Sequence, residues 1–447
     1  EGGGSGGGAS GGQGEALDAA LACAAEAMSD VEDRIIRAKA EQICEVLMRC
    51  GKVVSEHVPK SMRYVGKCLA RCASGASAEA GEKHGKRAFQ ATLNLTIDGR
   101  PKVRKTAVFA VSDVLRRTRG SAIGATYCGM VAAYAEKIGG APEREAAELQ
   151  KARGAAGAKD ARARATAAAT EALYMLGAMK TVLPELVEPA AGMCVDACAG
   201  LLDLDEPLLT QHATEALLAL ANSPESCASA DTVSGMMRPI VTVANANLKT
   251  APVMVISLAR LLARAQCKLH AIDVAESTKA LPSTFHALVK LFASPHEGVA
   301  TEVAEDLVLL VRSCVDTNMV QEGIKAIATA RAKGKDKPSK PPAILSIASS
   351  IEESIGFRYR GAWAMSIPVA TVAFVRLGPA SGPILAGTLN ALGEMGEHAS
   401  ELMCKQQLQD CITAAIQAIG PEQVLQSLPL KLEEAINAEI SSREAED

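Results

Sequence analysis

Clustered basic side chains are the residues of this chain whose types and spacing could do chemistry, and that chemistry is the binding of phosphate groups. A first cluster brackets one apolar helical segment, so that guanidinium and ammonium groups could hold phosphates through charge-assisted contacts. The alternative is a solvated helix face whose cations pair with local carboxylates such as Asp98 and Asp113. On the first interpretation the predicted RNA-binding residues are Arg100, Lys102, Arg104, Lys105, Arg116, Arg117 and Arg119.

Two further basic groups indicate contacts with a partner. Residues 331–342 read RAKGKDKPSKPP, which is typical of a nuclear localisation signal, of a nucleic-acid contact or of a solubilising linker. Residues 356–363 hold the single Trp, and they place arginines on the side opposite to Tyr359 and Trp363, which fit a core face. Because Trp, Tyr and Arg are enriched at hot spots, this segment is a candidate protein contact as well as a core segment. The predicted partner-binding residues are Arg358, Arg360, Lys333, Lys335 and Lys337.

Catalytic and metal-binding motifs give no assignment. The sequence contains no phosphate-binding loop, no H-E-x-x-H and no dinucleotide fingerprint between a strand and a helix. The pattern G-x-S-x-G occurs only in the Gly/Ser-rich residues 1–14, where no strand accompanies it to form a nucleophile elbow. The closest pairs among its 13 cysteines, Cys68 with Cys72 and Cys194 with Cys198, have four-residue spacing, unlike the C-x-x-C of metal or redox sites. We therefore expect buried free thiols in a reducing compartment, no catalytic, cofactor-binding or metal-binding residues, and a protein that is not an enzyme.

The overall composition restricts the partners. The formal net charge of −4 provides no global positive field, so any RNA contact must be local. No uninterrupted apolar run reaches the roughly 18 to 20 residues that cross a bilayer, and we expect a soluble, intracellular protein without a membrane partner. The chain begins with Glu1, which suggests that it starts inside a longer protein.

Apolar residues recur at helical spacing with a long period. Hydrophobic residues make up 48% of the chain but aromatic residues only 3%, a composition that favours helices over sheets. Successive apolar faces start 45 residues apart, within the range of about 40 to 47 residues for HEAT units. These faces are Leu209, Ala213, Leu217 and Leu220; then Met254, Leu258, Leu262 and Ala265; then Val299, Val303, Leu307 and Leu310.

Three more faces follow the same pattern across interruptions, and apolar segments such as 172–183, 236–248 and 284–292 are expected to be the partner helices. A single helical hairpin cannot bury its apolar face alone, so neighbouring hairpins must stack. The additional faces are Val103, Ala107, Val111 and Val114; Tyr359, Trp363, Ile367 and Ala370; and Cys404, Leu408, Ile412 and Ala415.

The predicted fold is all-α, a solenoid of stacked HEAT/armadillo-like helical hairpins. Composition shifts divide it into helical repeats and intervening tracts of low complexity. The expected segments are a flexible Gly/Ser-rich tail (1–14), amino-terminal repeats (15–138), an Ala/Gly/charged insertion (139–169), central repeats (170–330), a basic Lys/Pro loop (331–342), carboxy-terminal repeats (343–435) and an acidic tail (436–447).

Three segments resemble a known family. Residues 354–363 read SIGFRYRGAW, residues 419–430 read IGPEQVLQSLPL, and residues 101–105 read PKVRK. These segments are similar to the ribosomal RNA-processing protein twelve family, nucleolar HEAT/armadillo-repeat factors of pre-ribosome maturation. The similarity runs from about Ala16 to Leu430, with the two low-complexity tracts as departures. Family members are longer, so the chain is expected to correspond to an amino-terminal portion.

The resemblance implies a scaffold that supports ribosomal RNA processing and the maturation or nuclear export of pre-ribosomal subunits. The implied partners are pre-ribosomal particles, ribosomal RNA, assembly factors and nuclear transport receptors, with a Ran-type GTPase as a further candidate. The implied location is the nucleus and nucleolus, with shuttling to the cytoplasm. The alternative function is a karyopherin-like transport receptor or a signalling scaffold with the same solenoid architecture.

Overall fold

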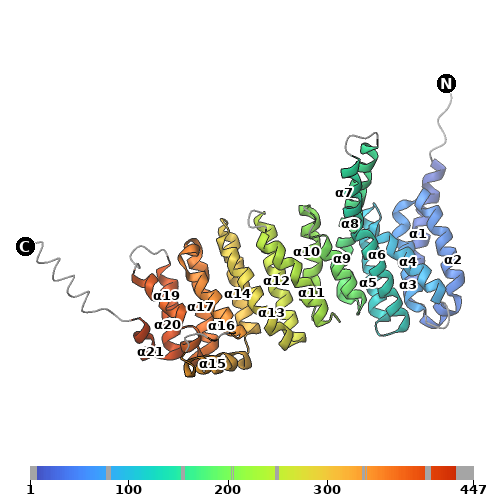
Figure 1. Ribbon diagram of the computed structural model, residues 1–447. Coiled ribbons are helices and arrows are strands. Elements are labelled where there is room, and N and C mark those ends of the chain that lie inside the picture. Colours follow the sequence, from blue (N-terminus) through green and yellow to red (C-terminus); the bar gives the residue numbers. More distant parts are fainter. Residues whose placement is uncertain are drawn as a thin grey trace, which may run out of the picture. The chain divides into compact units, whose positions relative to one another are not determined.

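The computed structural model describes residues 8–76, 82–152, 157–202, 204, 206–246, 251–334, 338, 340–397 and 404–428, without the side chains of 8–13, 57, 239–246 and 397. Throughout these residues the chain is helical and contains no strand, which confirms the predicted all-α fold (Figure 1). The helices form two compact units, residues 1–239 and 240–447, which we describe separately.

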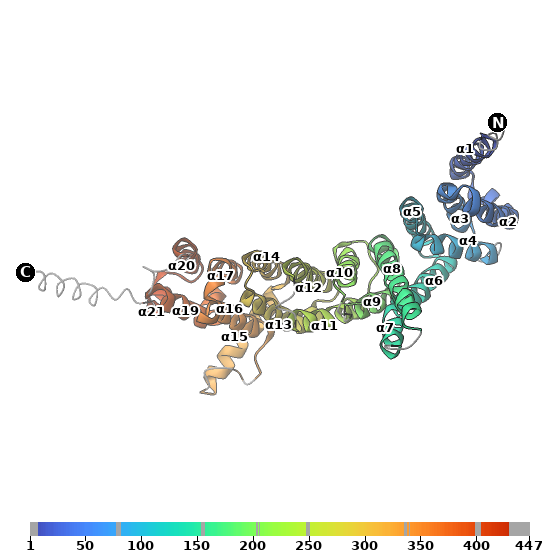
Figure 2. The same ribbon diagram turned by 90° about the horizontal axis from the view of Figure 1, so that it is seen from above.

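Unit 1 consists of two layers of helices (Figure 2). Neighbouring helices within a layer pack side by side, and each layer covers the apolar face of the other. Stacked hairpins thereby bury the apolar surface that a single hairpin would leave exposed. The first layer holds α1 (Gly8–Asp30), α3 (Met62–Gly75), α5 (Pro101–Thr118), α8 (Ala158–Val182) and α10 (Pro207–Asn222). The second holds α2 (Asp33–His57), α4 (Glu82–Asn94), α6 (Ala122–Gly139) and α9 (Ala190–Gly200); α7 (Ala141–Lys151) packs on α8, and η1 (Pro59–Ser61), η2 (Leu95–Ile97) and η3 (Leu183–Glu185) are short 3₁₀ turns.

Unit 2 repeats the two-layer arrangement, and α11 (Ala230–Ala246) crosses the boundary between the units. In Figure 2, α15 (Thr317–Ala332) lies outside both layers of unit 2, where it contacts α16 (Ala343–Ile355) and α18 (Ser381–Ile384). The first layer holds α12 (Pro252–Ile272), α14 (Glu297–Cys314), α17 (Trp363–Leu377) and α20 (Lys405–Ile419). The second holds α13 (Val274–Lys290), α16 (Ala343–Ile355) and α19 (Ala386–Glu397), followed by α21 (Pro421–Ser427); η4 (Leu291–Ala293), η5 (Phe357–Ala362), η6 (Gly378–Ala380) and α18 (Ser381–Ile384) are short connections.

The predicted apolar faces are the buried faces of α5, α10, α12 and α14. All sixteen side chains of these four faces are at most 8% exposed. Pro101, Pro207 and Pro252 lie in the first turns of α5, α10 and α12, where a missing backbone N–H costs no internal hydrogen bond. Helical periodicity therefore predicted these four helices correctly.

Two faces near the end of the chain depart from the pattern. Residues 357–362 form the 3₁₀ turn η5 instead of continuing α17, because Gly356 just before the turn and Gly361 within it favour helix weakly. Tyr359 is buried as predicted, but Trp363 is only half-buried. In α20, Ile412 is also half-buried, so the predicted face is only partly in the core.

Parts of the predicted low-complexity tracts are helical. Residues 8–14, assigned to a flexible tail, belong to α1, where they extend the Ala-rich segment that follows although glycine favours helix weakly. Within the predicted insertion 139–169, α7 and the start of α8 form a helical hairpin, as its Ala, Glu and Arg content allows. In the basic segment, α15 ends at Ala332 and α16 begins at Ala343, and the acidic residues 436–447 lie outside the described residues.

A polar network lies inside the hairpin of α12 and α13. Gln266 is fully buried, and its side-chain amide donates to Ser277 O at 3.0 Å and to Ser277 Oγ at 2.8 Å. Its amide oxygen accepts a hydrogen bond from Thr284 Oγ1 at 3.1 Å. Because every partner comes from α13, the network fixes how these two helices pair.

One stretch of the described residues, Phe357–Ile384, is long and apolar enough to cross a membrane by length and composition. Its most apolar window has a mean hydropathy of 1.3, and 44% of that window is buried. The stretch is built from η5, α17, η6 and α18, and α17 packs between α14 and α20. This position is that of a first-layer helix of a HEAT unit.

Candidate nucleic-acid interface

Arg100, the first predicted RNA-binding residue, is held in the turn before α5. Its Nε donates to Asp98 Oδ1 at 2.7 Å, and its Nη1 donates to Pro59 O at 2.8 Å. Burial by itself would raise the pKa of Asp98, but hydrogen bonds from Arg100 and the charge of Arg104 outweigh it and lower that pKa. Arg100 therefore joins two turns of unit 1 and pairs with Asp98, one of the two carboxylates named as local partners.

Three arginines around the end of α5 also have acidic partners. Arg116 Nη2 and Arg119 Nη2 contact the two carboxylate oxygens of Glu185 in η3, at 3.0 and 2.8 Å. Arg117 Nε lies 2.7 Å from Asp113 Oδ2, one helical turn away. These pairs neutralise much of the positive charge at this end of the predicted ridge.

The remaining three cations lie near the start of α5. Lys102 and Lys105 are exposed, and neither has an ion-pair partner among the described residues. Arg104 Nη1 donates to Asp98 O at 2.7 Å, and its guanidinium carbon lies 3.7 Å from the ring centre of Tyr174 in α8. A cation at this distance over an aromatic ring is attracted by the ring's negative face.

Tyr174 lines two pockets along α8, one against α5 and the other against the turn that precedes α5, and together we name them the α5–α8 groove. The pockets have volumes of about 490 and 750 Å³. The first is lined by Thr96, Pro101, Arg104, Lys105, Val108, Phe109, Leu173, Tyr174, Gly177, Ala178, Thr181 and His212, and the second by Ile97, Gly99, Lys159, Arg162, Ala163, Thr166, Ala167, Thr170, Glu171 and Tyr174.

The groove combines positive charge with aromatic rings. Lys105, Lys159 and Arg162 are exposed cations without an ion-pair partner in the described part of the chain, and they face a single lining carboxylate, Glu171. Phe109 is 58% exposed. At the far end, His212 Nδ1 lies 3.1 Å from Lys180 Nζ, and Lys180 also pairs with Glu215. Cations next to accessible rings can hold phosphates and stack unpaired bases.

The second predicted cluster is dispersed along unit 2. Lys333 is exposed at the end of α15, whereas Lys335 and Lys337 lie outside the described residues. Arg358 and Arg360 are exposed in η5, where Arg360 lies 5.8 Å from the ring of Phe357. Phe357 is 77% exposed, so an apolar ring and two cations share one surface turn.

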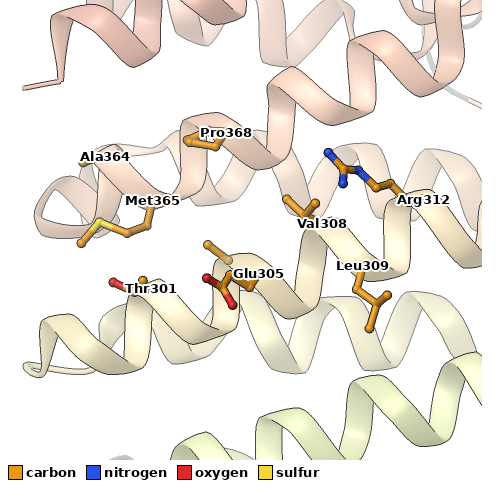
Figure 3. A pocket seen from close by; sticks show the side chains of 9 residues that line it. Thr301, Glu305, Val308, Leu309, Arg312, Ala364, Met365 and Pro368 are labelled. Carbon is orange, nitrogen blue, oxygen red and sulfur yellow. The ribbon is translucent and has the colours of Figure 1, made fainter.

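A third pocket, of about 500 Å³, lies between α14 and α17 of unit 2. Figure 3 shows apolar side chains such as Val308, Leu309 and Met365 along it, with Glu305 and Arg312 as its charged groups. Among the described residues, no three His, Cys, Asp or Glu side chains are grouped so that they could hold a metal ion. The pocket is therefore mainly apolar, with one carboxylate and one guanidinium.

Sequence reasoning missed the α8 side of the groove. Lys159 and Arg162 lie in the tract interpreted as an insertion, and Tyr174 lies in a segment interpreted as a partner helix. Arg104 and Tyr174 meet because α5 and α8 are neighbours in the first layer. The one available signal was Tyr174 itself, one of only five tyrosines.

Comparison with protein families identifies the repeats. Residues 9–228 match the family described as RRP12-like, N-terminal HEAT repeats. Residues 293–444 match the family described as ribosomal RNA-processing protein 12, HEAT repeats. The two matches together include most of the chain.

Curated relatives carry the same name. The RRP12-like protein of Gallus gallus is 24% identical over 348 residues, covering 77% of this chain and 25% of its own length. The RRP12-like protein of Homo sapiens is 23% identical over 375 residues, covering 83% of this chain and 27% of its own length. The chain therefore spans about a quarter of the length of these relatives.

Among solved structures, the karyopherin Kap121p is similar over 91% of this chain and 52% of its own, at 10% identity and a TM-score of 0.28. A score this low supports no conclusion about function. The family matches, in contrast, agree with the resemblance of residues 101–105, 354–363 and 419–430 noted in the sequence. The chain belongs to the RRP12 family of HEAT-repeat proteins, which is named for ribosomal RNA processing.

Proposed function

We propose that the chain is a non-enzymatic scaffold in ribosome biogenesis that binds RNA and assembly factors. It supports ribosomal RNA processing and the maturation or nuclear export of pre-ribosomal subunits. Family membership supports the process, and the α5–α8 groove is the observation that carries the RNA contact. The scaffold works in the nucleus and nucleolus and shuttles with its cargo, with nuclear transport receptors and a Ran-type GTPase as partners in export.

The groove offers two kinds of contact to a single RNA strand. Lys105, Lys159 and Arg162 are free to meet phosphates, because their charges have no ion-pair partner in the described part of unit 1. Phe109 offers an exposed ring on which a base can stack, a contact of about 1–3 kcal/mol per base. Arg104 and Tyr174 support each other between the two pockets. The expected ligand is an unpaired segment of RNA, since rings cannot reach bases inside a duplex.

Removing the free cations should weaken RNA binding. The combined variant Lys105→Ala, Lys159→Ala and Arg162→Ala is expected to bind a fluorescent single-stranded RNA about tenfold or more weakly, because three phosphate contacts are lost. The slope of log affinity against log salt should become shallower by about two, at roughly 0.7 per phosphate. Fluorescence anisotropy over a series of salt concentrations measures both quantities.

A control variant removes the same charge elsewhere in unit 1. Lys86, Arg117 and Lys151 are paired with Glu82, Asp113 and Glu148, so their combined replacement by Ala should leave the affinity nearly unchanged. Equal losses in both variants would mean that net charge, and not the groove, governs binding. Introducing both sets into the full-length protein and comparing its co-sedimentation with pre-ribosomal particles tests the cellular role.

The surface turn η5 is the proposed contact for an assembly factor. Exposed Phe357 with Arg358 and Arg360 supplies an apolar anchor and two cations, the composition of a hot spot. Replacing all three by Ala should lower the recovered amount of a subset of the co-purifying proteins by at least about tenfold. The reason is that hot-spot side chains contribute roughly 2 kcal/mol or more each. Quantitative mass spectrometry measures this loss. An unchanged set of partners would contradict the assignment, and RNA affinity should not change.

A further inference from the structure

Two cysteines of unit 2 are in contact although they are far apart in sequence. The Cys314 thiol, on the last residue of α14, donates to Cys267 Sγ in α12, with the sulfur atoms 4.0 Å apart. Cys314 is fully buried, whereas Cys267 is partly exposed. The packing of α12 against α14 in the first layer places the two thiols together.

We propose that Cys267 and Cys314 form a reversible, peroxide-sensitive thiol pair that closes to a disulfide between adjacent repeats. The accessible Cys267 is the thiol that a hydroperoxide can reach. The buried Cys314 is the thiol that resolves the product. Redox-sensing cysteines have this arrangement, with an accessible nucleophile next to a second thiol.

The surroundings favour Cys267 as the nucleophile. Hydrogen bonds from Cys314 and Ser313, with the charge of Arg264, lower the pKa of the Cys267 thiol, although its partial burial and the charge of Asp306 oppose this change. The thiolate is the reactive form, so a lower pKa increases the reactive fraction. Burial has the opposite effect elsewhere, and it raises the pKa of Cys68 to about 11 and of Cys198 to about 12.

The reaction balances with a hydroperoxide as the only oxidant. The Cys267 thiolate attacks one peroxide oxygen, the O–O bond breaks, and Cys267 becomes a sulfenic acid while hydroxide leaves and takes up the thiol proton as water. Cys314 then attacks the sulfenic sulfur, the S–O bond breaks, and a second water leaves as the disulfide forms. Two thiols lose two electrons to the peroxide. The sulfur atoms must approach each other by about 2 Å.

The disulfide would complete a connection among three neighbouring first-layer helices, α12, α14 and α17. Arg376 of α17 already donates from Nε and Nη2 to Val315 O, at 3.1 and 2.7 Å, next to Cys314. A disulfide from Cys314 to Cys267 would add α12 to this connection. Since small rotations between units set the curvature of a solenoid, the disulfide would fix the angle between two repeats.

Peroxide treatment of the reduced, folded chain tests the proposal directly. Limited hydrogen peroxide at neutral pH should join the tryptic peptides 265–268 and 313–325 with the loss of two hydrogen atoms, and dithiothreitol should reverse the link. Cys267 should lose its free thiol at least about tenfold faster than the buried Cys411. Mass spectrometry after alkylation of free thiols measures both. Absence of the linked peptides while the exposed Cys23 and Cys227 are oxidised would overturn the proposal.

Two variants separate the roles of the thiols. Cys314→Ser should leave Cys267 as a sulfenic acid that dimedone traps, because the resolving thiol is missing. Cys267→Ser should prevent rapid oxidation of Cys314. Cys194 and Cys198, a buried pair on α9, are the matched control and should remain reduced in the folded protein. Linked 265–268 and 313–325 peptides that form only in urea would contradict a pair positioned by the fold.

Discussion

Replacing Phe89 by Ala is expected to lower the free energy of unfolding of unit 1 by about 3–5 kcal/mol. Phe89 in α4 is fully buried and stacks on Tyr127 of α6, with ring centres 4.3 Å apart and planes inclined by 12°. Truncation removes the ring and leaves a cavity between two second-layer helices. Hydrogen exchange measured by mass spectrometry should show faster exchange in peptides from α4 and α6, but not in peptides from α12.

Two further variants test whether burial causes this effect. Phe109→Ala removes a phenyl ring from a side chain that is 58% exposed, so the free energy of unfolding should change by no more than about 0.5 kcal/mol. Tyr127→Phe keeps the stacked ring but removes the hydroxyl that donates to Ala73 O at 3.0 Å, at an expected cost of about 1–2 kcal/mol. If amide hydrogens of α4 and α6 exchanged as slowly in Phe89→Ala as in the native chain, the stacked pair would not stabilise the second layer.

Replacing Asp306 by Asn is expected to raise the free energy of unfolding of unit 2 at pH 7 by about 2 kcal/mol. Asp306 in α14 is 7% exposed, and its Oδ2 has no hydrogen-bond partner among the described residues. Burial raises the pKa of this carboxyl from 3.8 to about 6, although the nearby charges of Arg260 and Arg264 oppose the rise. At pH 7 the folded protein must therefore hold a charge that burial disfavours, and Asn removes that charge.

The stabilising effect of Asp306→Asn should depend on pH. Because the folded-state pKa is the higher one, protonation of Asp306 stabilises the fold below about pH 4, and this contribution is lost as the pH rises through about 6. The difference between variant and native chain should grow between these values and stay constant above pH 7. Fluorescence of Trp363, the single Trp, follows urea unfolding of unit 2. Glu322→Gln, at an exposed site in α15 of the same unit, should give no such difference.

The repeat period was predictable from sequence because it depends on local information. Faces such as Val299 to Leu310 alternate at helical spacing, and the side chains that satisfy the spacing are the buried ones. The prolines at the starts of α5, α10 and α12 reflect an equally local preference. Tyr359 also satisfied the spacing, but spacing carries no information about the 3₁₀ turn that interrupts the helix there.

The candidate sites were only partly predictable, because they depend on which helices are neighbours. Asp98 and Asp113 were correct partners since they lie within a few residues of Arg100 and Arg117. Glu185 was missed because η3 reaches the end of α5 only through the fold. The Ala-rich start of α8 gave a weak amphipathic signal, and its place in the first layer was therefore not recognised.

The contact between Cys267 and Cys314 was also missed, because it depends on which helices are neighbours. The pairs that sequence spacing suggested, such as Cys194 with Cys198, share a helix face. The thiols in contact lie 47 residues apart, which is close to one repeat of 45. A repeat period thus predicts which residues stack on one another, provided that no insertion lies between them.

The buried amide of Gln266 limits how this gene segment can be rearranged. Repeat arrays grow by internal duplication. A copied hairpin remains stable in a new position when the second helix of one hairpin can cover the first helix of another. Gln266 can satisfy its amide only opposite Ser277 and Thr284, so a foreign second helix would leave that amide without partners, at a cost of about 1–3 kcal/mol. Residues 252–290 should therefore be inherited as one block, while purely apolar hairpins elsewhere can exchange their halves.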